Sequence, residues 1–402
     1  MNRQDDFAML QRQENGAPLA YLDSASTSQK PTVVLEAMRA FYQKSNANVH
    51  RGNYQLAEEA TEAYEGARKT IADALKVPSS TIIFTKSTTD GLNLVAQSFA
   101  LSEVQPGDEI LLTVAEHHAN LLPWQRVAQQ KGARLRFVDL NANGEIDWAA
   151  FEKKLNQKTK LVAFAHVSNV LGSVAPVKAL TRLAHAYGAT VVVDGAQAIG
   201  HFPVDLKDLD VDFYAFSGHK ALGPTGIGVL YGKSALLEEM APVQLGGEMI
   251  ETVTKTSATF AKSPFKFEAG TPNIAGAIGL ARAMTYLEEI GLSQIEKEEQ
   301  GLLSYALKEL AKLPEIVIYG PLSAARRSGL IAFNVRGVHP HDVGTILDMD
   351  GLTLRAGQHC AQPLMTALGV SSTLRLSFSV YSQKEEIDRL ILSLKRVLEV
   401  FS

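Results

Sequence analysis

Short apolar runs alternate with longer amphipathic stretches through the middle of the chain. Each short run is rich in β-branched residues and nearly free of polar ones, which is typical of strands buried on both faces of a parallel sheet. The expected strands cover residues 81–85, 109–114, 160–167, 190–195, 212–217 and 226–232. Stretches such as "PVKALTRLAHAYG" between them have the periodicity of amphipathic helices. This alternation predicts a doubly wound α/β domain.

The pattern changes at about residue 285. Long amphipathic helices are expected first, then the strand-like runs "LIAFNV", "LTLRAG" and "TLRLSFS", and finally the helical end "KEEIDRLILSLKRVLEVF". We therefore expect a smaller α+β domain over residues 285–402. A large domain over residues 21–280 and an N-terminal arm over residues 1–20 would precede it.

Composition and charge narrow the function classes. The 402 residues carry 39 Lys and Arg against 43 Asp and Glu, a net charge of −4 that favours neither nucleic acid nor an anionic membrane as partner. The N-terminal "MNRQDDFAML" has an acidic pair and no long apolar run, so no signal peptide is expected. No stretch approaches the roughly 20 apolar residues of a membrane span. The single cysteine, Cys360, excludes an internal disulfide framework and favours a reducing, cytoplasmic setting.

Polar residues follow the expected strands, where ligands bind in open α/β sheets. The Ser/Thr-rich turn "KSTTDG" follows residues 81–85. It can bind an anion through free N–H groups, but a helix cap by Thr88 or Thr89 explains the same residues. The pair His117-His118 follows the next strand without a Cys or carboxylate cluster at metal spacing. It predicts an aromatic platform or packed histidines, and no metal site.

An amide, a carboxylate and an amine follow the next three strands. They are Asn169, then Asp194 with Gln197, then Lys220, which lies among glycines in "SGHKALGPTG". Glycines let a backbone approach a bound group closely. Each residue alone has an ordinary explanation, such as a helix cap for Asp194. Together they match the needs of pyridoxal 5′-phosphate (PLP): a lysine for its aldehyde, a carboxylate for its ring nitrogen, a stacking ring and a phosphate turn.

Motifs over nearly the whole chain carry a family resemblance. They are "YLDSAS" (21–26), "NVHRG" (48–52), "EHHANLLPWQ" (116–125), "HVSNVLG" (166–172), "VDGAQA" (193–198), "DFYAFSGHKALGPTGIGVLYG" (212–232), "FEAGTPN" (267–273) and "RAGQHCAQPL" (355–364). This set resembles the SufS/CsdA-type (group II) cysteine desulfurases of the class V aminotransferase family, which are fold-type I PLP enzymes. The resemblance implies a seven-stranded, mostly parallel PLP domain and a smaller domain that carries the cysteine loop.

The resemblance also implies an activity and roles for individual residues. L-Cysteine would become L-alanine, leaving a persulfide on Cys360 whose sulfur passes to an acceptor protein for iron–sulfur cluster assembly. Lys220 would bind PLP and act as base, and His117 would stack on the ring. The other implied PLP contacts are Asp194, Gln197, Thr89, Ser217, His219 and, from the second subunit of a homodimer, Thr271. The implied substrate contacts are Asn169, Arg375 and Arg355.

Alternatives remain open at this point. A selenocysteine lyase shares most of these residues, and a PLP-binding scaffold without catalysis would share the cofactor site. A single cysteine is most often a small buried hydrophobe, although "RAGQHCAQP" is a poor core segment. Arg375 alternates with apolar residues in "TLRLSFS" and would, without the resemblance, be placed on the surface of an edge strand.

The segment "RGVHPHDV" (336–343) suggests the sulfur acceptor. Its histidines flank a proline, as in an exposed turn where Asp342 caps the following helix. The pattern also resembles desulfurases that serve a zinc-containing SufU-type acceptor, which implies that His341 contacts the zinc of that partner. A SufE-like acceptor without zinc is the alternative.

Overall fold

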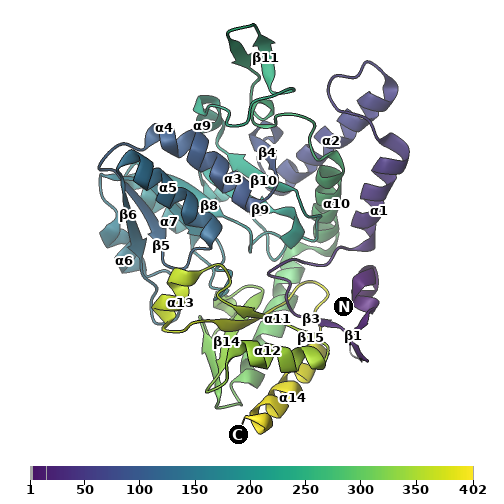
Figure 1. Ribbon diagram of the computed structural model, residues 1–402, viewed down its shortest axis with the longest axis vertical. Helices are drawn as coiled ribbons and strands as arrows, with labels where there is room; N and C mark the ends of the chain where they lie inside the picture. The colour runs from purple at the N-terminus through teal and green to yellow at the C-terminus, as the bar shows by residue number, and fades with distance from the viewer. Residues whose placement is uncertain (1–2, 15, 402) are drawn as a thin grey trace.

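A mixed sheet lies at the centre of the larger of two units in the computed structural model, which describes residues 3–14 and 16–401 (Figure 1). The strand order is β4-β10-β9-β8-β7-β5-β6. The strands are β4 (Ile82–Thr85), β5 (Glu109–Thr113), β6 (Arg134–Val138), β7 (Thr159–Ala165), β8 (Thr190–Asp194), β9 (Phe213–Ser217) and β10 (Gly228–Gly232). Neighbouring strands run parallel except at β10, which is antiparallel to both β4 and β9. The predicted α/β class is confirmed.

Apolar side chains on both faces of this sheet explain why helices cover both. Along β8, Val191 and Val193 pack on one face and Val192 on the other, as strand geometry requires. The first face is covered by α1 (Thr32–Ala40), α2 (Gln55–Ala74), α6 (Trp148–Lys154), α7 (Val177–Ala186), α8 (Leu206–Leu209) and α10 (Ile274–Ile290). The second face is covered by α3 (Thr88–Leu94), α4 (Leu101–Glu103), α5 (Leu122–Lys131) and α9 (Ser234–Glu239).

One strand of the sheet is not revealed by the apolar pattern. β6, with the sequence "RLRFV", lies at the sheet edge beside β5, and Arg134 and Arg136 are exposed while the residues between and after them are partly or fully buried. An edge strand with one solvated side keeps polar residues at alternate positions. It therefore lacks the continuous apolar run by which the other strands are predicted.

An antiparallel sheet in the order β13-β14-β17-β16 organises the smaller unit. Its strands are β13 (Ile316–Tyr319), β14 (Leu330–Val335), β16 (Arg355–Gly357) and β17 (Thr373–Ser377). The apolar faces of α11 (Leu292–Leu310), α12 (Pro340–Met349) and α14 (Lys384–Val400) share one buried core with this sheet. The short helix α13 (Gln362–Leu368) follows the cysteine loop. The predicted smaller α+β unit is thus present.

The N-terminal segment connects the two units. After the short hairpin of β1 (Gln13–Glu14) and β2 (Ala17–Pro18), strand β3 (Ala20–Tyr21) pairs in parallel with β15 (Leu352–Thr353). Ala20 and Leu22 lie in the core of the smaller unit. Asp23 then bridges to Ser377 at the end of β17 before the chain enters the larger unit.

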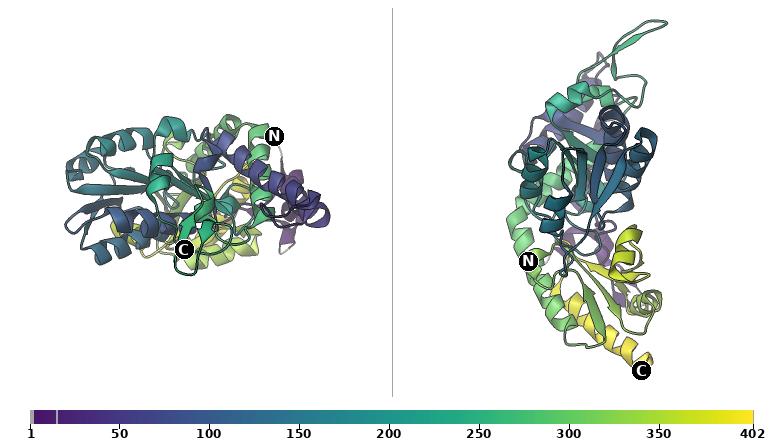
Figure 2. Two further views of the ribbon diagram at one scale, coloured as in Figure 1. Left: turned by 90° about the horizontal axis from the view of Figure 1, so that it is seen from above. Right: turned by 90° about the vertical axis from the view of Figure 1, so that its left-hand side faces the viewer.

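A separate hairpin extends away from the body of the larger unit (Figure 2). It consists of β11 (Ile250–Val253) and β12 (Ala258–Phe260), and nearly all of its side chains are exposed. Within residues 3–14 and 16–401, no helix has both the length and the apolar character needed to span a membrane.

Candidate active site

A cavity of about 230 Å³ lies where the two units meet, at the carboxyl ends of the parallel strands. We call it the Lys220 cavity. The predicted site residues that line it are Lys220, Cys360, His117, Asp194, Gln197, Thr89, Ser217, His219, Asn169, Arg375 and Arg355. The last residues of β8 and β9 and the segments that follow β4, β5, β7, β8 and β9 supply those of the larger unit. The rest come from β16, β17 and the cysteine loop. Of the residues predicted for the site, only Thr271 lies elsewhere.

Lys220 lies one short turn beyond the end of β9. Burial lowers the pKa of its amine to about 8, partly offset by the nearby Asp194 carboxylate. Asp194 ends β8 and is buried, which raises its pKa, and its Oδ1 accepts a hydrogen bond from the Ala196 N–H at 2.9 Å. The Asp194 carboxyl also lines the cavity, where it lies close enough to the Lys220 amine to interact with its charge.

The turn after β4 presents hydroxyl and N–H groups to the cavity. Ser87, rather than Thr88 or Thr89, is the N-cap of α3, and it accepts from the Asp90 N–H. The Ser217 Oγ at the end of β9 lies 2.8 Å from the Thr88 nitrogen and 2.7 Å from its hydroxyl. This close approach requires Gly228 on the strand between, because a Cβ there would lie 2.7 Å from the Ser87 Cα.

His117 supplies a flat, uncharged ring. Burial and the nearby Lys220 amine lower its pKa to about 4. Its Nδ1 accepts from the Ala119 N–H at 3.0 Å, which fixes the ring direction. The preceding Glu116 is buried and accepts from the Thr113 hydroxyl and the Asn120 amide. These contacts hold the imidazole at the cavity wall.

The cysteine loop is tied to the larger unit by a histidine that the sequence reasoning missed. The Cys360 carbonyl accepts from the His118 N–H at 2.7 Å, and the His118 Nε2 accepts from the Gln362 N–H at 3.3 Å. The Cys360 side chain is exposed, so the alternative of a buried core cysteine is wrong. The position of His118 in "EHHANLLPWQ" places it next to a predicted site residue. Its contact with Cys360 could not be predicted, because the two residues are 242 positions apart in the sequence.

Arg375 is 3% exposed on the interior strand β17, so the edge-strand alternative is also wrong. Its Nη1 donates to the Asn169 carbonyl at 2.8 Å, and its Nη2 donates to the Ser26 hydroxyl at 2.7 Å and to Asp23 Oδ1 at 3.2 Å. Arg355 Nε lies 3.4 Å from the other oxygen of Asp23. Two guanidinium groups therefore share one carboxylate, which leaves the region positive and suited to an anion.

Thr271 is exposed and lines a different hollow, together with Lys86 and Gly226. The loop that carries it begins at Glu268, whose carboxylate accepts from Arg68 at 2.6 and 2.8 Å and from the Phe84 N–H of β4 at 2.7 Å. Its predicted contact with the phosphate of a second subunit stays a prediction.

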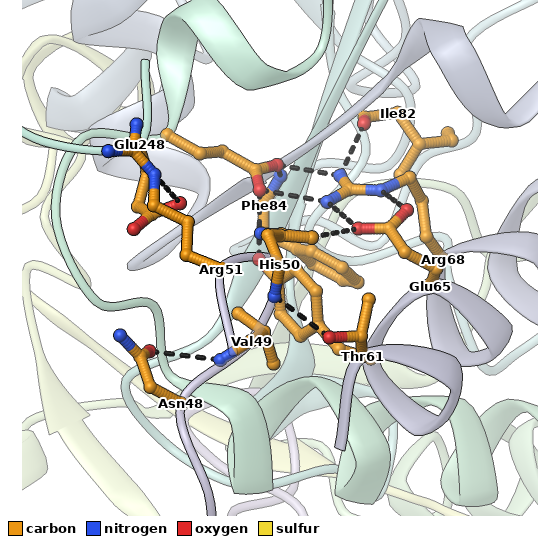
Figure 3. A network of polar contacts seen from close by, with 12 residues as sticks. Asn48, Val49, His50, Arg51, Thr61, Glu65, Arg68, Ile82, Phe84 and Glu248 are labelled. Carbon is orange, nitrogen blue, oxygen red and sulfur yellow. Dashed lines mark hydrogen bonds and ion pairs between the residues drawn. The ribbon is translucent and has the colours of Figure 1, made fainter. Parts of the chain in front are cut away.

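Arg68 is the centre of this anchoring network, which Figure 3 shows from close by. The guanidinium is 1% exposed and also donates to Glu65 on its own helix and to the Ile82 carbonyl of β4. Glu65 in turn contacts the His50 ring at 3.0 Å. One buried cation thus joins helix α2, strand β4 and the loop of Thr271.

His341 is exposed on the first turn of α12. Its backbone N–H donates to the ring nitrogen of His339 at 3.2 Å. The helix is therefore capped by the His339 imidazole, and the expectation that Asp342 caps it is wrong.

The residues of the Lys220 cavity fit PLP. A buried carboxylate at a strand end suits a protonated ring nitrogen, a neutral imidazole suits ring stacking, and a lysine with a lowered pKa suits bonding to an aldehyde. The hydroxyls of Ser217 and the turn after β4 suit a phosphate group. Gln197 also lines the cavity, and its side-chain amide donates to the Ala25 carbonyl at 2.8 Å.

Comparison with known proteins agrees with this geometry. The model of the class-V aminotransferase family matches residues 20–390, and the chain belongs to that family. A probable cysteine desulfurase of Halalkalibacterium halodurans is 51% identical over 396 residues, covering 98% of this chain and 97% of that protein. One of Staphylococcus aureus is 51% identical over 398 residues, covering 99% and 96%. The predicted enzyme class, cysteine desulfurase, is confirmed.

Solved structures agree as well. The apo cysteine desulfurase of Thermococcus onnurineus superposes with a TM-score of 0.94 at 41% identity, covering 99% of this chain and 98% of that one. The cysteine desulfurase CsdA of Escherichia coli, in an S-sulfonic acid form, gives 0.91 at 44% identity with the same coverage. A more distant cystine C–S lyase, solved with its product cysteine persulfide, gives 0.82 at 26% identity, covering 96% of this chain and 98% of that one.

Proposed function

We propose that this chain uses PLP to convert L-cysteine to L-alanine and collects the sulfur as a persulfide on Cys360. The observation that carries the proposal is the lining of one cavity by an exposed thiol, a lysine of lowered pKa and a buried arginine. The relatives named as cysteine desulfurases support it.

Lys220, Asp194, His117 and the hydroxyls of the phosphate turn would hold the cofactor. When bound, PLP supplies an electron sink for the charge that develops at the substrate Cα. The lowered pKa of Lys220 suits its Nζ to take the Cα proton near neutral pH, because far more of the amine is then unprotonated than at the ordinary lysine pKa of 10.5. Asp194 would contact the cofactor ring nitrogen from the end of β8, whereas Arg355 and Arg375 reach the cavity from β16 and β17 of the smaller unit.

Arg375 and Asn169 would orient the substrate through its carboxylate. The fork of a guanidinium pairs with both oxygens of a carboxylate, and β17 and Asn169 hold this fork in place. The thiolate of Cys360 then attacks the substrate sulfur. An S–S bond forms, the C–S bond breaks, and its electron pair stays with the carbon skeleton, which leaves as alanine after protonation.

The test is Cys360→Ser, with Lys220→Ala as a second variant. Cys360→Ser should bind PLP normally and lose persulfide formation, because a hydroxyl is a far weaker nucleophile than a thiolate. Lys220→Ala should lose the visible absorbance of bound PLP and all turnover. Alanine release from L-cysteine at the wild-type rate by Cys360→Ser would contradict the proposal and favour a selenocysteine lyase.

We also propose a homodimer in which Thr271 reaches the phosphate of the neighbouring subunit. The support is its exposed position on an anchored loop outside the cavity of its own chain. PLP would then stabilise the dimer, because a ligand that binds only the assembled site favours assembly. Light scattering on the PLP-bound protein should give twice the chain mass, and a monomer that binds PLP tightly would contradict the assignment.

The sulfur would pass from Cys360 to an acceptor protein for iron–sulfur cluster assembly. We propose a SufU-type acceptor that contains zinc, with His341 as the contact. Its exposed position on the first turn of α12 supports this, as does the packing of α12 beside β16, the strand that leads into the cysteine loop. Imidazole is a suitable zinc ligand and can replace a thiolate of the partner.

A further inference from the structure

The short helix α13, which begins two residues after Cys360, is capped from the larger unit. Its own N-cap residue is Ala361, whose side chain cannot accept a hydrogen bond. The N–H at the first position of the helix, that of Gln362, instead donates to the His118 Nε2 at 3.3 Å. His118 therefore supplies, across the junction of the two units, an acceptor that Ala361 lacks.

A second contact of His118 acts on the cysteine itself. The His118 N–H donates to the Cys360 carbonyl at 2.7 Å, and the Asn169 amide donates to the preceding carbonyl, that of His359, at 2.7 Å. The backbone φ angles of His359 and Cys360 are +54° and +55°, a conformation that residues other than glycine seldom adopt. Such backbone persists only where neighbouring contacts hold it. The larger unit thus holds the cysteine loop in a conformation that the loop alone would not favour.

Apolar packing fixes the rest of α13. Leu364 and Met365 share a buried cluster with Ala115, Val170 and Leu171, which belong to the segments after β5 and β7. Burial therefore keeps the body of the helix on the larger unit, and the contacts of His118 fix the end at which the cysteine loop enters it.

The turn that carries His118 also carries the ring that is proposed to stack on the cofactor. The Nδ1 of His117 accepts from the Ala119 N–H at 3.0 Å, and Asn120 accepts from the Trp124 indole N–H at 3.0 Å. These bonds hold the turn itself in place. Two consecutive histidines therefore set the cofactor ring and the cysteine loop relative to one another.

We propose that His118 is a positioning residue whose ring, by capping α13, holds the Cys360 thiol where it can attack the sulfur of the bound substrate. This inference rests on the proposed function. In the held loop the thiol lines the Lys220 cavity, and a released loop would relax its strained backbone and carry the sulfur away. His118 is not among the residues that line the cavity, so it acts through Cys360.

Removing the N–H donor tests the cap without a change at His118. Gln362→Pro lacks this N–H, and proline is well tolerated at the first position of a helix. Gln362→Ala is the matched control, because it keeps the N–H and loses the same side-chain bond to Gln358. When the PLP-bound protein is mixed with L-cysteine, Gln362→Pro should form the Cys360 persulfide about fivefold more slowly, the effect of one lost hydrogen bond, and Gln362→Ala should match the wild type. Equal rates in the two variants would overturn the proposal.

Two substitutions of His118 test the acceptor from the other side. His118→Gln places a side-chain oxygen near the position of Nε2, whereas His118→Phe keeps a ring and has no acceptor. His118→Phe should slow persulfide formation about fivefold and leave unchanged the visible absorbance change of PLP that reports L-cysteine binding, and His118→Gln should restore most of the rate.

Two results would overturn the proposal in favour of a general structural role. One is an equal loss of substrate binding and persulfide formation in His118→Phe, and the other is a failure of His118→Gln to restore the rate. Wild-type protein that binds PLP but forms no persulfide from L-cysteine would instead overturn the proposed function.

Discussion

Burial sets the charge of individual residues in the Lys220 cavity. It lowers the pKa of Lys220 to about 8 and that of His117 to about 4, and it raises the pKa of Asp194. Removing a charged group from water disfavours its charged form, whichever sign it has. At neutral pH the cavity therefore presents an uncharged imidazole and a lysine that is partly unprotonated, which is the state that reacts with an aldehyde.

A pH dependence of cofactor uptake follows from the Lys220 titration. Only the unprotonated amine reacts, so the initial rate of PLP uptake by the PLP-free protein should rise with pH and level off above about 8, rather than near 10.5. Asp194→Asn removes a charge that raises this pKa, so the midpoint should move to lower pH. The measurement is stopped-flow absorbance, with Lys220→Ala as the background control. A midpoint near 10.5, or one that rises in Asp194→Asn, would contradict this account.

Separate elements of the larger unit are joined by buried ionic contacts as well as by apolar packing. Arg68 on α2 donates to Glu268 of the Thr271 loop and to the β4 carbonyl of Ile82. Its guanidinium also lies over the Phe84 ring, 4.6 Å from the centroid. The network thus sets the position of β4, which leads into the turn of Ser87 and Thr88, relative to the loop of Thr271.

Arg68→Ala should lower the free energy of unfolding by about 3–5 kcal/mol, because it leaves the Glu268 carboxylate buried without its counter-charge. Lys69→Ala is the matched control on the same helix. Lys69 pairs with Asp73 at 2.7 Å, but both side chains are largely exposed, and such pairs contribute about 1 kcal/mol or less. Urea denaturation followed by circular dichroism measures both. Equal losses in the two variants would show that the buried network is not what stabilises this region.

The site as a whole depends on how the two units meet. Asp23, in the segment between β3 and the larger unit, contacts Arg375, and His118 of the larger unit holds the Cys360 loop of the smaller one. A change at this junction therefore alters the position of the Arg375 guanidinium and that of the Cys360 loop together. Under the proposed function, the exposed thiol is also where the molecule would meet a sulfur acceptor.

Sulfur transfer to that acceptor is expected to depend on His341. His341→Ala should keep its activity on L-cysteine alone, because this exposed residue is not among those that line the Lys220 cavity. It should lose the stimulation that a zinc-containing SufU-type protein gives to the wild type. A SufE-like protein without zinc is the control and should act equally on both. Equal stimulation by the zinc protein would remove His341 from the transfer.

Much of the larger unit could be predicted from local pattern. Strands such as β8 and β9 are continuous apolar runs because both faces of the sheet are covered, and ligand groups at their carboxyl ends must share one edge. The cavity position of Asp194 and Lys220 follows from that geometry. β6 was missed because an edge strand needs apolar residues on one side only.

Only the tertiary structure determined which remote segments of the chain contact one another. Three contacts of the site each join residues more than 200 positions apart. Arg375 donates to the Asn169 carbonyl, Asp23 contacts the guanidinium groups of both Arg375 and Arg355, and the His118 N–H donates to the Cys360 carbonyl. Arg68 and Glu268 are likewise remote, 200 positions apart. Hydrophobic periodicity predicts which side of a helix or strand is buried. It does not predict which polar atom of a distant segment will bond to a polar side chain on that buried side. Residue type and order determined the chemistry available to this protein, and the packing of the two units determined which groups act together.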